Sequence, residues 1–429
     1  MEDNSLVTVS EAFLKGVERK AERLNTLMEM SAILSSTLDL DELISVVMEK
    51  AKSELNAEAC SILFYDKEKE RLEFKGAICE DEKISEGLQK EGTVEIGQGI
   101  AGEVARTLQP VFLEDVRIDN RFSQEAERFE GFPVKGLIAV PLVGRSGLIG
   151  VAEILNPRRK DYDRDIVQLL AKQFAIAIEN SLFYKEAIER ERLRQELDIA
   201  STIQKSFLPE SSTLKKGDLA VTAVNMPAEQ VGGDLYDFIE QGEERVGVLI
   251  GDVSGKGISA ALYMARFSSD FRYVARLAET PSLALSRVNL SLLKSPRGMF
   301  MTCIYLVVDI GSGSVHVAVA GHPPFLWLTK GELKVMSMQA GPPLGIISAE
   351  YPLTAISLEK GDRLLLLTDG AFDVQDRAGQ RLGFENLVTF VEAHRQEKEL
   401  VNTIGGYVDD FSKGAEKADD VTVVELKWG

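Results

Sequence analysis

The chain has 429 residues, which at about 150 residues per domain predicts two or three domains. Its hydrophobic content of 45% and charged content of 27% are typical of a soluble globular protein. The formal net charge of −19 argues against a nucleic-acid partner, because phosphate backbones are bound through clustered Lys and Arg. The three cysteines lie far apart, which excludes a disulfide framework and favours a reducing cytoplasm. No apolar run approaches the roughly 18 residues of a membrane span, so we expect a cytoplasmic protein.

The first part of the chain predicts a helix, a second helix and then a sheet. Apolar residues recur at helical spacing up to about Ser36, and again from Leu43 to Ala51, where Asp39 or Asp41 could cap the helix. Strand-like segments follow, and the block ends near Pro157. These segments are Cys60–Tyr65, Leu72–Ile78, Gln109–Leu113, Gly136–Leu142 and Leu148–Leu155.

A long helix without Pro or Gly is predicted from Asp163 to about Phe207. Apolar positions recur in steps of four and three, as in a coiled-coil seam, and the register fails where Glu191 and Gln195 fall on seam positions. The seam positions are Leu170, Phe174, Ala177, Ser181, Tyr184 and Ile188. Two interpretations stay open for the first part, an amphipathic helix packed on its own domain or a dimer seam. For the charged stretch 179–196 we expect a solvated connecting helix that dimerises.

Leu208-Pro209 ends this helix, and the remainder alternates strands and helices in an α+β pattern. We therefore divide the chain into an N-terminal helix (1–37), a first domain (38–182), a helical linker (183–209) and a second domain (210–429).

Four acidic motifs lie at the ends of predicted strands in the second domain: Gly232-Gly233-Asp234, Asp252-Val253-Ser254-Gly255, Thr368-Asp369-Gly370 and Asp419-Asp420. The strands at 234–239 and 246–250 predict a hairpin centred on Glu243. In that register Asp234 and Asp252 face each other at the open end of the ladder. Carboxylates gathered in this way repel one another unless protons or cations compensate them, and oxygen ligands suit Mg²⁺ or Mn²⁺. Each motif alone is an ordinary turn, but jointly they predict a metal site.

These motifs, in this order, resemble the SpoIIE-like branch of the metal-dependent protein phosphatases, the bacterial relatives of protein phosphatase 2C. The resemblance covers roughly Leu197 to Glu425. It rests on Gly-Gly-Asp-Leu-Tyr-Asp-Phe (232–238), Gly-Asp-Val-Ser-Gly-Lys-Gly-Ile-Ser-Ala-Ala-Leu (251–262), Ala-Gly-His-Pro-Pro (320–324), Leu-Thr-Asp-Gly-Ala (367–371) and Asp-Asp-Val-Thr-Val-Val (419–424).

The resemblance implies a C-terminal αββα sandwich with a centre of two or more Mn²⁺ or Mg²⁺ ions. It assigns Asp234 and Asp252 to the bridging and catalytic position, with the Val253 carbonyl as a backbone ligand. Asp369 and Asp419 would hold the second ion, with Asp420 as the alternative to Asp419. Paired ions can activate a water for in-line attack on a phosphate, so no protein nucleophile is needed.

The helix that precedes the phosphatase domain also resembles its counterpart in this family. Ile203, Gln204 and Leu208 are the positions that carry this likeness, and we expect them to belong to a regulatory helix. Two positions depart from the family pattern. Ala228-Glu229-Gln230 stands where many members carry a phosphate-binding Arg, and Lys256 replaces a His. We interpret Lys256 as a surface turn residue and His322 as a residue that shapes its turn.

Residues from about Leu38 to Leu182 resemble a GAF domain, a module for small-molecule binding or dimerisation. The likeness rests on Glu95–Gly102, the strand at Gly136–Leu142 and Gly147–Val151. It implies an α/β/α sheet domain that forms a homodimer, and a small-molecule ligand of unknown identity stays open. Pro157 and Tyr162 depart from the cyclic-nucleotide pattern, so we do not expect a cyclic nucleotide.

Together these features predict a cytoplasmic phosphoserine/phosphothreonine protein phosphatase regulated by a GAF sensor. In related proteins the substrate is often a phosphorylated anti-sigma-factor antagonist of the STAS type, so we expect a partner-switching pathway. The alternative is a non-catalytic signalling adaptor that uses the phosphatase fold for partner binding. A cyclic-dinucleotide synthase is rejected, because Leu235-Tyr236 follows Gly-Gly-Asp where that family carries Glu-Phe.

Overall fold

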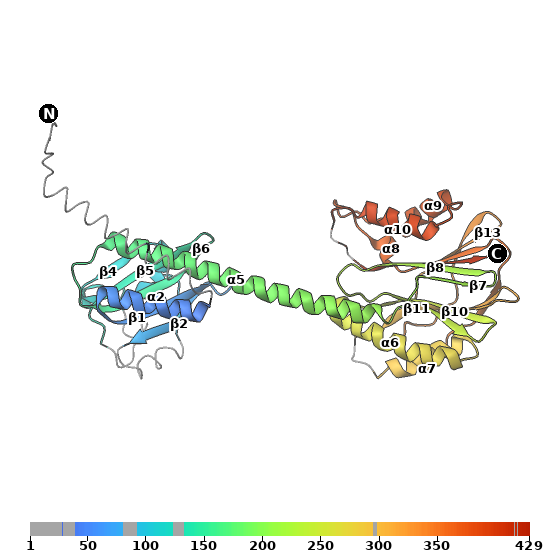
Figure 1. Cartoon of the computed structure of the whole chain (residues 1–429), viewed down its shortest axis with the longest axis horizontal. Helices are drawn as coiled ribbons and strands as arrows, with labels where there is room; N and C mark the ends of the chain where they lie inside the picture. The colour runs from blue at the N-terminus through green and yellow to red at the C-terminus, as the bar shows by residue number, and fades with distance from the viewer. Residues whose placement is uncertain are drawn as a thin grey trace, which may run out of the picture. The chain divides into compact units, whose positions relative to one another are not determined.

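The structure is a computed structural model that describes residues 28, 39–79, 92–122, 133–294, 298–415, 417 and 419–429. The chain divides into two compact units, Met1–Glu191 and Arg192–Gly429, which are coloured from blue to green and from green to red in Figure 1. The helix expected up to Ser36 lies outside the described residues, apart from Met28. None of the described helices combines the length and the apolar character that a membrane crossing needs.

Unit one is built on a six-stranded antiparallel sheet with the strand order β3-β2-β1-β6-β5-β4. The central strand β1 buries side chains on both faces, with Cys60, Ile62 and Phe64 in one apolar cluster and Ala59 and Leu63 in the other. The strands are β1 (Ala57–Asp66), β2 (Arg71–Cys79), β3 (Thr93–Glu95), β4 (Val111–Leu113), β5 (Leu137–Gly144) and β6 (Gly147–Pro157).

Helices cover both faces of this sheet. On one face lie α2 (Leu40–Leu55) and the first part of α5 (Arg164–Lys205), and on the other lie α4 (Gly99–Thr107) and the short helix η1 (Val116–Ile118). The expected cap of the first of these helices is confirmed, because the Asp39 carboxylate accepts a hydrogen bond of 2.9 Å from the Glu42 amide. This arrangement is the predicted α/β/α sheet domain.

The long helix α5 is buried only in its first part. Leu170, Phe174 and Ser181 pack within unit one, whereas Tyr184 and Ile188 are exposed. The interpretation of an amphipathic helix packed on its own domain therefore holds for Leu170 and Phe174, which are buried within unit one. The apolar period of a helix marks a buried face, but it does not say which partner covers that face. A seam through the exposed part stays a prediction.

Unit two is a sandwich of two antiparallel sheets with the orders β15-β12-β11-β10-β9 and β14-β13-β16-β17-β8-β7. A cluster of apolar side chains, among them Val248, Leu306 and Val424, fills the space between the sheets. The strands of the first sheet are β9 (Leu235–Gln241), β10 (Arg245–Val253), β11 (Met301–Asp309), β12 (Ser314–Ala320) and β15 (Thr354–Ser357). Those of the second are β7 (Thr213–Lys216), β8 (Leu219–Met226), β13 (Phe325–Thr329), β14 (Glu332–Met336), β16 (Arg363–Leu367) and β17 (Val421–Trp428).

Helices pack on the outer face of each sheet of unit two. α6 (Gly257–Leu277) and α7 (Pro281–Leu292) cover the first sheet, and α9 (Phe384–Ala393) and α10 (Leu400–Phe411) cover the second, next to the short helix α8 (Gly370–Asp373). Figure 1 shows these four layers, with α6 and α7 on one side and α9 and α10 on the other. The predicted αββα sandwich is confirmed.

Candidate functional site

The β9–β10 hairpin brings the first two acidic motifs together. Its paired residues lie equally far on either side of Glu243, and the last pair of the ladder is Leu235 with Gly251. Asp234 is the residue before β9 and Asp252 follows Gly251 in β10, so the predicted hairpin register is confirmed. Asp252 also pairs with Thr302 across to β11.

Asp234 is almost completely buried, with 4% of its surface exposed. Its Oδ2 accepts hydrogen bonds from the hydroxyls of Thr368 (2.8 Å) and Thr422 (2.7 Å). Its Oδ1 is buried and has no hydrogen-bond partner among the described residues. Burial, followed by the charge of Asp252, raises the pKa of Asp234. A buried, unpartnered carboxylate oxygen is costly unless a proton or a cation meets it.

Asp252 connects this pair to the other two motifs. Burial, followed by the charges of Asp369 and Asp419, raises the pKa of Asp252 to about 7. Asp369 follows β16 and Asp419 precedes β17, which are neighbours in the second sheet. The ends of both sheets thus direct four carboxylates toward one region.

The two adjacent aspartates before β17 have different surroundings. Asp420 accepts hydrogen bonds from the backbone amides of Ala228 (2.8 Å) and Gly233 (2.6 Å), so its carboxylate holds the loop that leads to Asp234. Asp419 is half-buried, which raises its pKa, and the nearby charge of Lys256 lowers it. The charges of both aspartates act on Asp252, and that of Asp419 raises the pKa of Asp252 more than that of Asp420 does.

Two glycines allow the close approach of these segments. A Cβ added to Gly233 would lie 2.8 Å from the Val253 carbonyl oxygen, and one added to Gly370 would overlap the Asp420 carbonyl oxygen. Side chains at these positions would push the acidic segments apart. The Gly-Asp and Asp-Gly pairs of the motifs thus have a steric reason.

The end of α5 contacts the first acidic motif directly. The Gln204 side chain donates to the Gly232 carbonyl (2.5 Å) and accepts from the Gly232 amide (3.1 Å). A cavity of about 20 Å³ beside this contact is lined in part by Gln204 and Asp234. Of the other two positions expected in a regulatory helix, Leu208 packs against the apolar core and Ile203 is exposed.

The structure adds contacts around the site that the sequence did not show. Thr368 and Thr422 lie inside the motifs, but only the packing of the two sheets shows that their hydroxyls meet Asp234. Lys256 is an exposed turn residue as expected, yet its charge acts on Asp419. His322 is buried, its Nδ1 lies 2.9 Å from the Thr302 hydroxyl, and burial lowers its pKa to about 3. A neutral His322 agrees with a structural role in its turn.

The donor set of this site fits a hard divalent cation. It consists of carboxylate oxygens with a backbone carbonyl beside them, and one buried oxygen of Asp234 lacks a partner. Among the described side chains, no three His, Cys, Asp or Glu residues stand close enough to form a closed ligand set. Cation binding would therefore require these side chains to come closer together.

Two segments of the chain match known protein families. Residues 242–429 match the family described as Stage II sporulation protein E (SpoIIE), and residues 37–179 match the family described as GAF domain. The first match covers most of unit two and the second covers the sheet of unit one.

Individual relatives share the same regions. The chain is 26% identical over 266 residues to Protein IcfG of Synechocystis sp., which covers 54% of this chain and 41% of IcfG. It is 29% identical over 186 residues to the phosphoserine phosphatase RsbP of Bacillus subtilis, which covers 42% of this chain and 46% of RsbP. It is 28% identical over 247 residues to the phosphoserine phosphatase RsbU of Bacillus subtilis, which covers 56% of this chain and 71% of RsbU. The chain thus spans less than half the length of the first two relatives.

A solved structure shares the fold of the C-terminal part. The SiaA-PP2C domain of Pseudomonas aeruginosa superimposes with a TM-score of 0.51 at 21% identity, covering 57% of this chain and 100% of that domain. At this level of identity the similarity shows a common fold.

Proposed function

We propose that the chain is a metal-dependent protein phosphatase that joins a GAF domain to a SpoIIE-type protein phosphatase 2C domain, because its two segments match these two families. Its reaction is the hydrolysis of phosphoserine or phosphothreonine in a protein. The observation that carries the proposal is the buried Asp234 Oδ1 without a partner, next to Asp252 and within reach of the charges of two further aspartates.

We assign the ligands by their surroundings. Asp234, Asp252 and the Val253 carbonyl would hold a Mn²⁺ or Mg²⁺ ion, and Asp369 and Asp419 would hold a second. Asp420 is assigned to the loop instead, because its carboxylate already accepts backbone amides. When bound, such ions lower the pKa of a water and stabilise charge on the phosphoryl oxygens.

The chain's own residues position these groups. Thr368 and Thr422 fix Oδ2 of Asp234, which leaves Oδ1 directed to the site. The neutral His322 supports Thr302, the β11 residue opposite Asp252. No proton transfer is assigned to His322, because a pKa of about 3 leaves it without a proton to donate at neutral pH.

The proposed substrate class is supported by the names of two relatives. RsbP and RsbU are named phosphoserine phosphatases, and we extend that substrate class to this chain. We further propose that the substrate is a phosphorylated STAS-type anti-sigma-factor antagonist, that the pathway is one of partner switching, and that the protein acts in the cytoplasm as a homodimer.

Regulation is proposed to pass through the end of α5. Gln204 holds both backbone groups of Gly232, two residues before Asp234, so a shift of this helix end would move the first ligand segment. The GAF domain precedes this helix in the chain and is the proposed sensor.

The test is phosphate release from a phosphoserine-containing STAS protein by the full chain. We expect release with Mn²⁺ and none with EDTA, and the Asp252→Asn variant should be inactive. Undiminished activity of Asp252→Asn would contradict the metal assignment. Saturable Mn²⁺ binding without turnover on any phosphoprotein would favour the non-catalytic adaptor, an alternative with which the open ligand set is compatible.

A further inference from the structure

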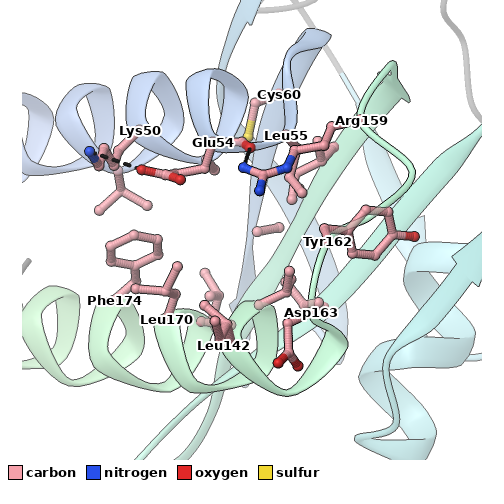
Figure 2. A pocket seen from close by; sticks show the side chains of 18 of the residues that line it. Lys50, Glu54, Leu55, Cys60, Leu142, Arg159, Tyr162, Asp163, Leu170 and Phe174 are labelled. Atoms are coloured by element: carbon pink, nitrogen blue, oxygen red, sulfur yellow. Dashed lines mark hydrogen bonds and ion pairs between the residues drawn. The ribbon is translucent and has the colours of Figure 1, made fainter. Parts of the chain in front are cut away.

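Unit one contains a cavity of about 860 Å³ between α2 and α5, above strands β1, β5 and β6 (Figure 2). This volume lies within the range of about 300–1,000 Å³ that small-molecule sites occupy. The cavity is on the face of the sheet opposite α4, and its lining includes no residue of the acidic cluster.

The base of the cavity is apolar. Ile62, Val140 and Leu142 of the sheet line it together with Leu170 and Phe174 of α5. In Figure 2, Phe174, Leu170 and Leu142 lie along one wall, across the gap from α2. A ligand segment seated here must be aliphatic or aromatic, because a polar group would lose its water without gaining hydrogen bonds from these side chains.

Charged residues surround the mouth of the same cavity. Lys50 and Glu54 on α2 form an ion pair of 3.1 Å, so each already has a partner of opposite charge. Arg159 is held less firmly: its Nη1 lies 3.4 Å from the Glu54 carbonyl oxygen, and its Nε lies 3.3 Å from Oδ1 of the exposed Asp161. Both distances are at the long end for hydrogen bonds. Figure 2 shows the Arg159 guanidinium directed toward α2 at the edge of the gap.

We propose that this cavity binds an amphipathic monocarboxylate, with its acyl or arylalkyl chain on the apolar base and its carboxylate on Arg159. A guanidinium can exchange two long, exposed contacts for a bidentate, charge-assisted pair with a carboxylate. The apolar base alone would accept many molecules, and the head group is selected by Arg159, whose charge must outweigh those of Asp161 and Asp163 in the same lining.

The proposed site is independent of the phosphatase assignment. Its residues belong to unit one, and the inference concerns binding, so it can succeed or fail whatever the catalytic activity of unit two. Because Leu170 and Phe174 belong to α5, a bound ligand would touch the same helix that carries Gln204.

The test is calorimetric titration of the full chain with decanoate below its micelle concentration, with decanol as the uncharged probe. We expect saturable decanoate binding with one site per chain. Arg159→Gln should weaken decanoate binding about tenfold, as expected for a lost hydrogen bond to a charged group, and leave decanol binding unchanged. Arg158→Gln is the matched control, because Arg158 pairs with Glu58 outside the cavity and its loss should change neither probe.

A second variant tests where the acyl chain of the ligand lies. Ala51→Phe places a ring into the cavity from α2 and should abolish binding of both probes while the circular dichroism and melting temperature stay those of the parent. The proposal is overturned by three results. The first is that the parent chain shows no saturable binding of decanoate. The second is that decanoate binds but neither Arg159→Gln nor Ala51→Phe alters its affinity. The third is that the parent does not bind decanoate and Ala51→Phe changes the oligomeric mass. The last result would assign the cavity to a second copy of the chain.

Discussion

Units one and two both bury carboxyl groups, but they surround them differently. In unit one, Glu153 is buried against the Ser61 hydroxyl at 3.1 Å, and Glu179 accepts the amides of Arg145 and Ser146. Each of these carboxyls is single and has a local partner. A proton on Glu153, or the backbone amides that meet Glu179, is enough to stabilise such a buried carboxyl.

Unit two contains both kinds of carboxyl. Asp237 and Glu425 each meet an arginine, Arg272 and Arg363. The aspartates of the acidic cluster instead raise one another's pKa values, and Asp234 retains a buried oxygen without a partner. Structural carboxyls in this protein have partners, whereas the clustered ones repel. Such an arrangement reduces stability and is typical of a functional site.

The largest effect is expected from Asp234→Asn. Loss of this ligand should reduce phosphate release about 10³-fold, which corresponds to about 4 kcal/mol of transition-state stabilisation. In EDTA the same variant should be at least as stable as the parent, because one repelling charge is gone. The measurements are steady-state kinetics and urea unfolding, with the exposed Asp218→Asn as a control that should change neither. A strongly destabilised Asp234→Asn would place this residue among the structural carboxyls.

Arg272→Met, in contrast to Asp234→Asn, should reduce the stability of the fold. In the Arg272–Asp237 ion pair the carboxylate is almost completely buried. Arg272 also donates a hydrogen bond of 2.8 Å to the Phe207 carbonyl. Removal of the arginine leaves Asp237 buried without its cation and should lower the free energy of unfolding by about 3 kcal/mol. Arg192→Met breaks an exposed ion pair with Glu196 and should change the free energy of unfolding by less than about 0.5 kcal/mol. Equal effects of the two variants in urea unfolding would contradict this ranking.

Glu153→Gln tests one of the two isolated carboxyls of unit one. Burial raises the pKa of Glu153 from 4.5 to about 7, so the folded state favours the protonated form. Its contribution to stability is complete below pH 4.5 and is lost as the pH rises through 7, a loss of about 3 kcal/mol for unit one. Glu153→Gln should therefore remove this pH dependence and make unit one more stable than the parent at pH 8. Unfolding curves at pH 5 and pH 8 measure this, and the exposed Glu68→Gln should retain the parental dependence.

Gln204→Ala is expected to have the smallest effect. It removes two hydrogen bonds to Gly232 and should reduce phosphate release about five- to tenfold with little change in stability. Arg194→Ala, an exposed residue on the same helix, is the control. Activity equal to the parent in Gln204→Ala would remove α5 from the proposed regulation.

The sequence was most informative where structure is local. The β9–β10 register follows from the turn at Glu243, so the facing of Asp234 and Asp252 could be predicted before any packing was known. The hydroxyls of Thr368 and Thr422 could not be assigned in this way, because their contact with Asp234 depends on how two sheets pack. The different surroundings of Asp419 and Asp420 likewise depend on a loop nearly two hundred residues away.

Helix α5 shows the same limit in unit one. Its repeating apolar positions predicted a buried face, and only the structure showed that Leu170 and Phe174 face their own sheet. The cavity between α2 and α5 was also beyond the sequence, since the volume left between two packed helices depends on their separation.

The most direct test of the acidic cluster as a cation site is calorimetric titration with Mn²⁺ at constant pH. The parent chain and Asp218→Asn should bind Mn²⁺ saturably, and Asp234→Asn should lose at least one binding event. Identical Mn²⁺ isotherms for the parent and Asp234→Asn would contradict the account, because the unpartnered buried oxygen would then have no part in cation binding.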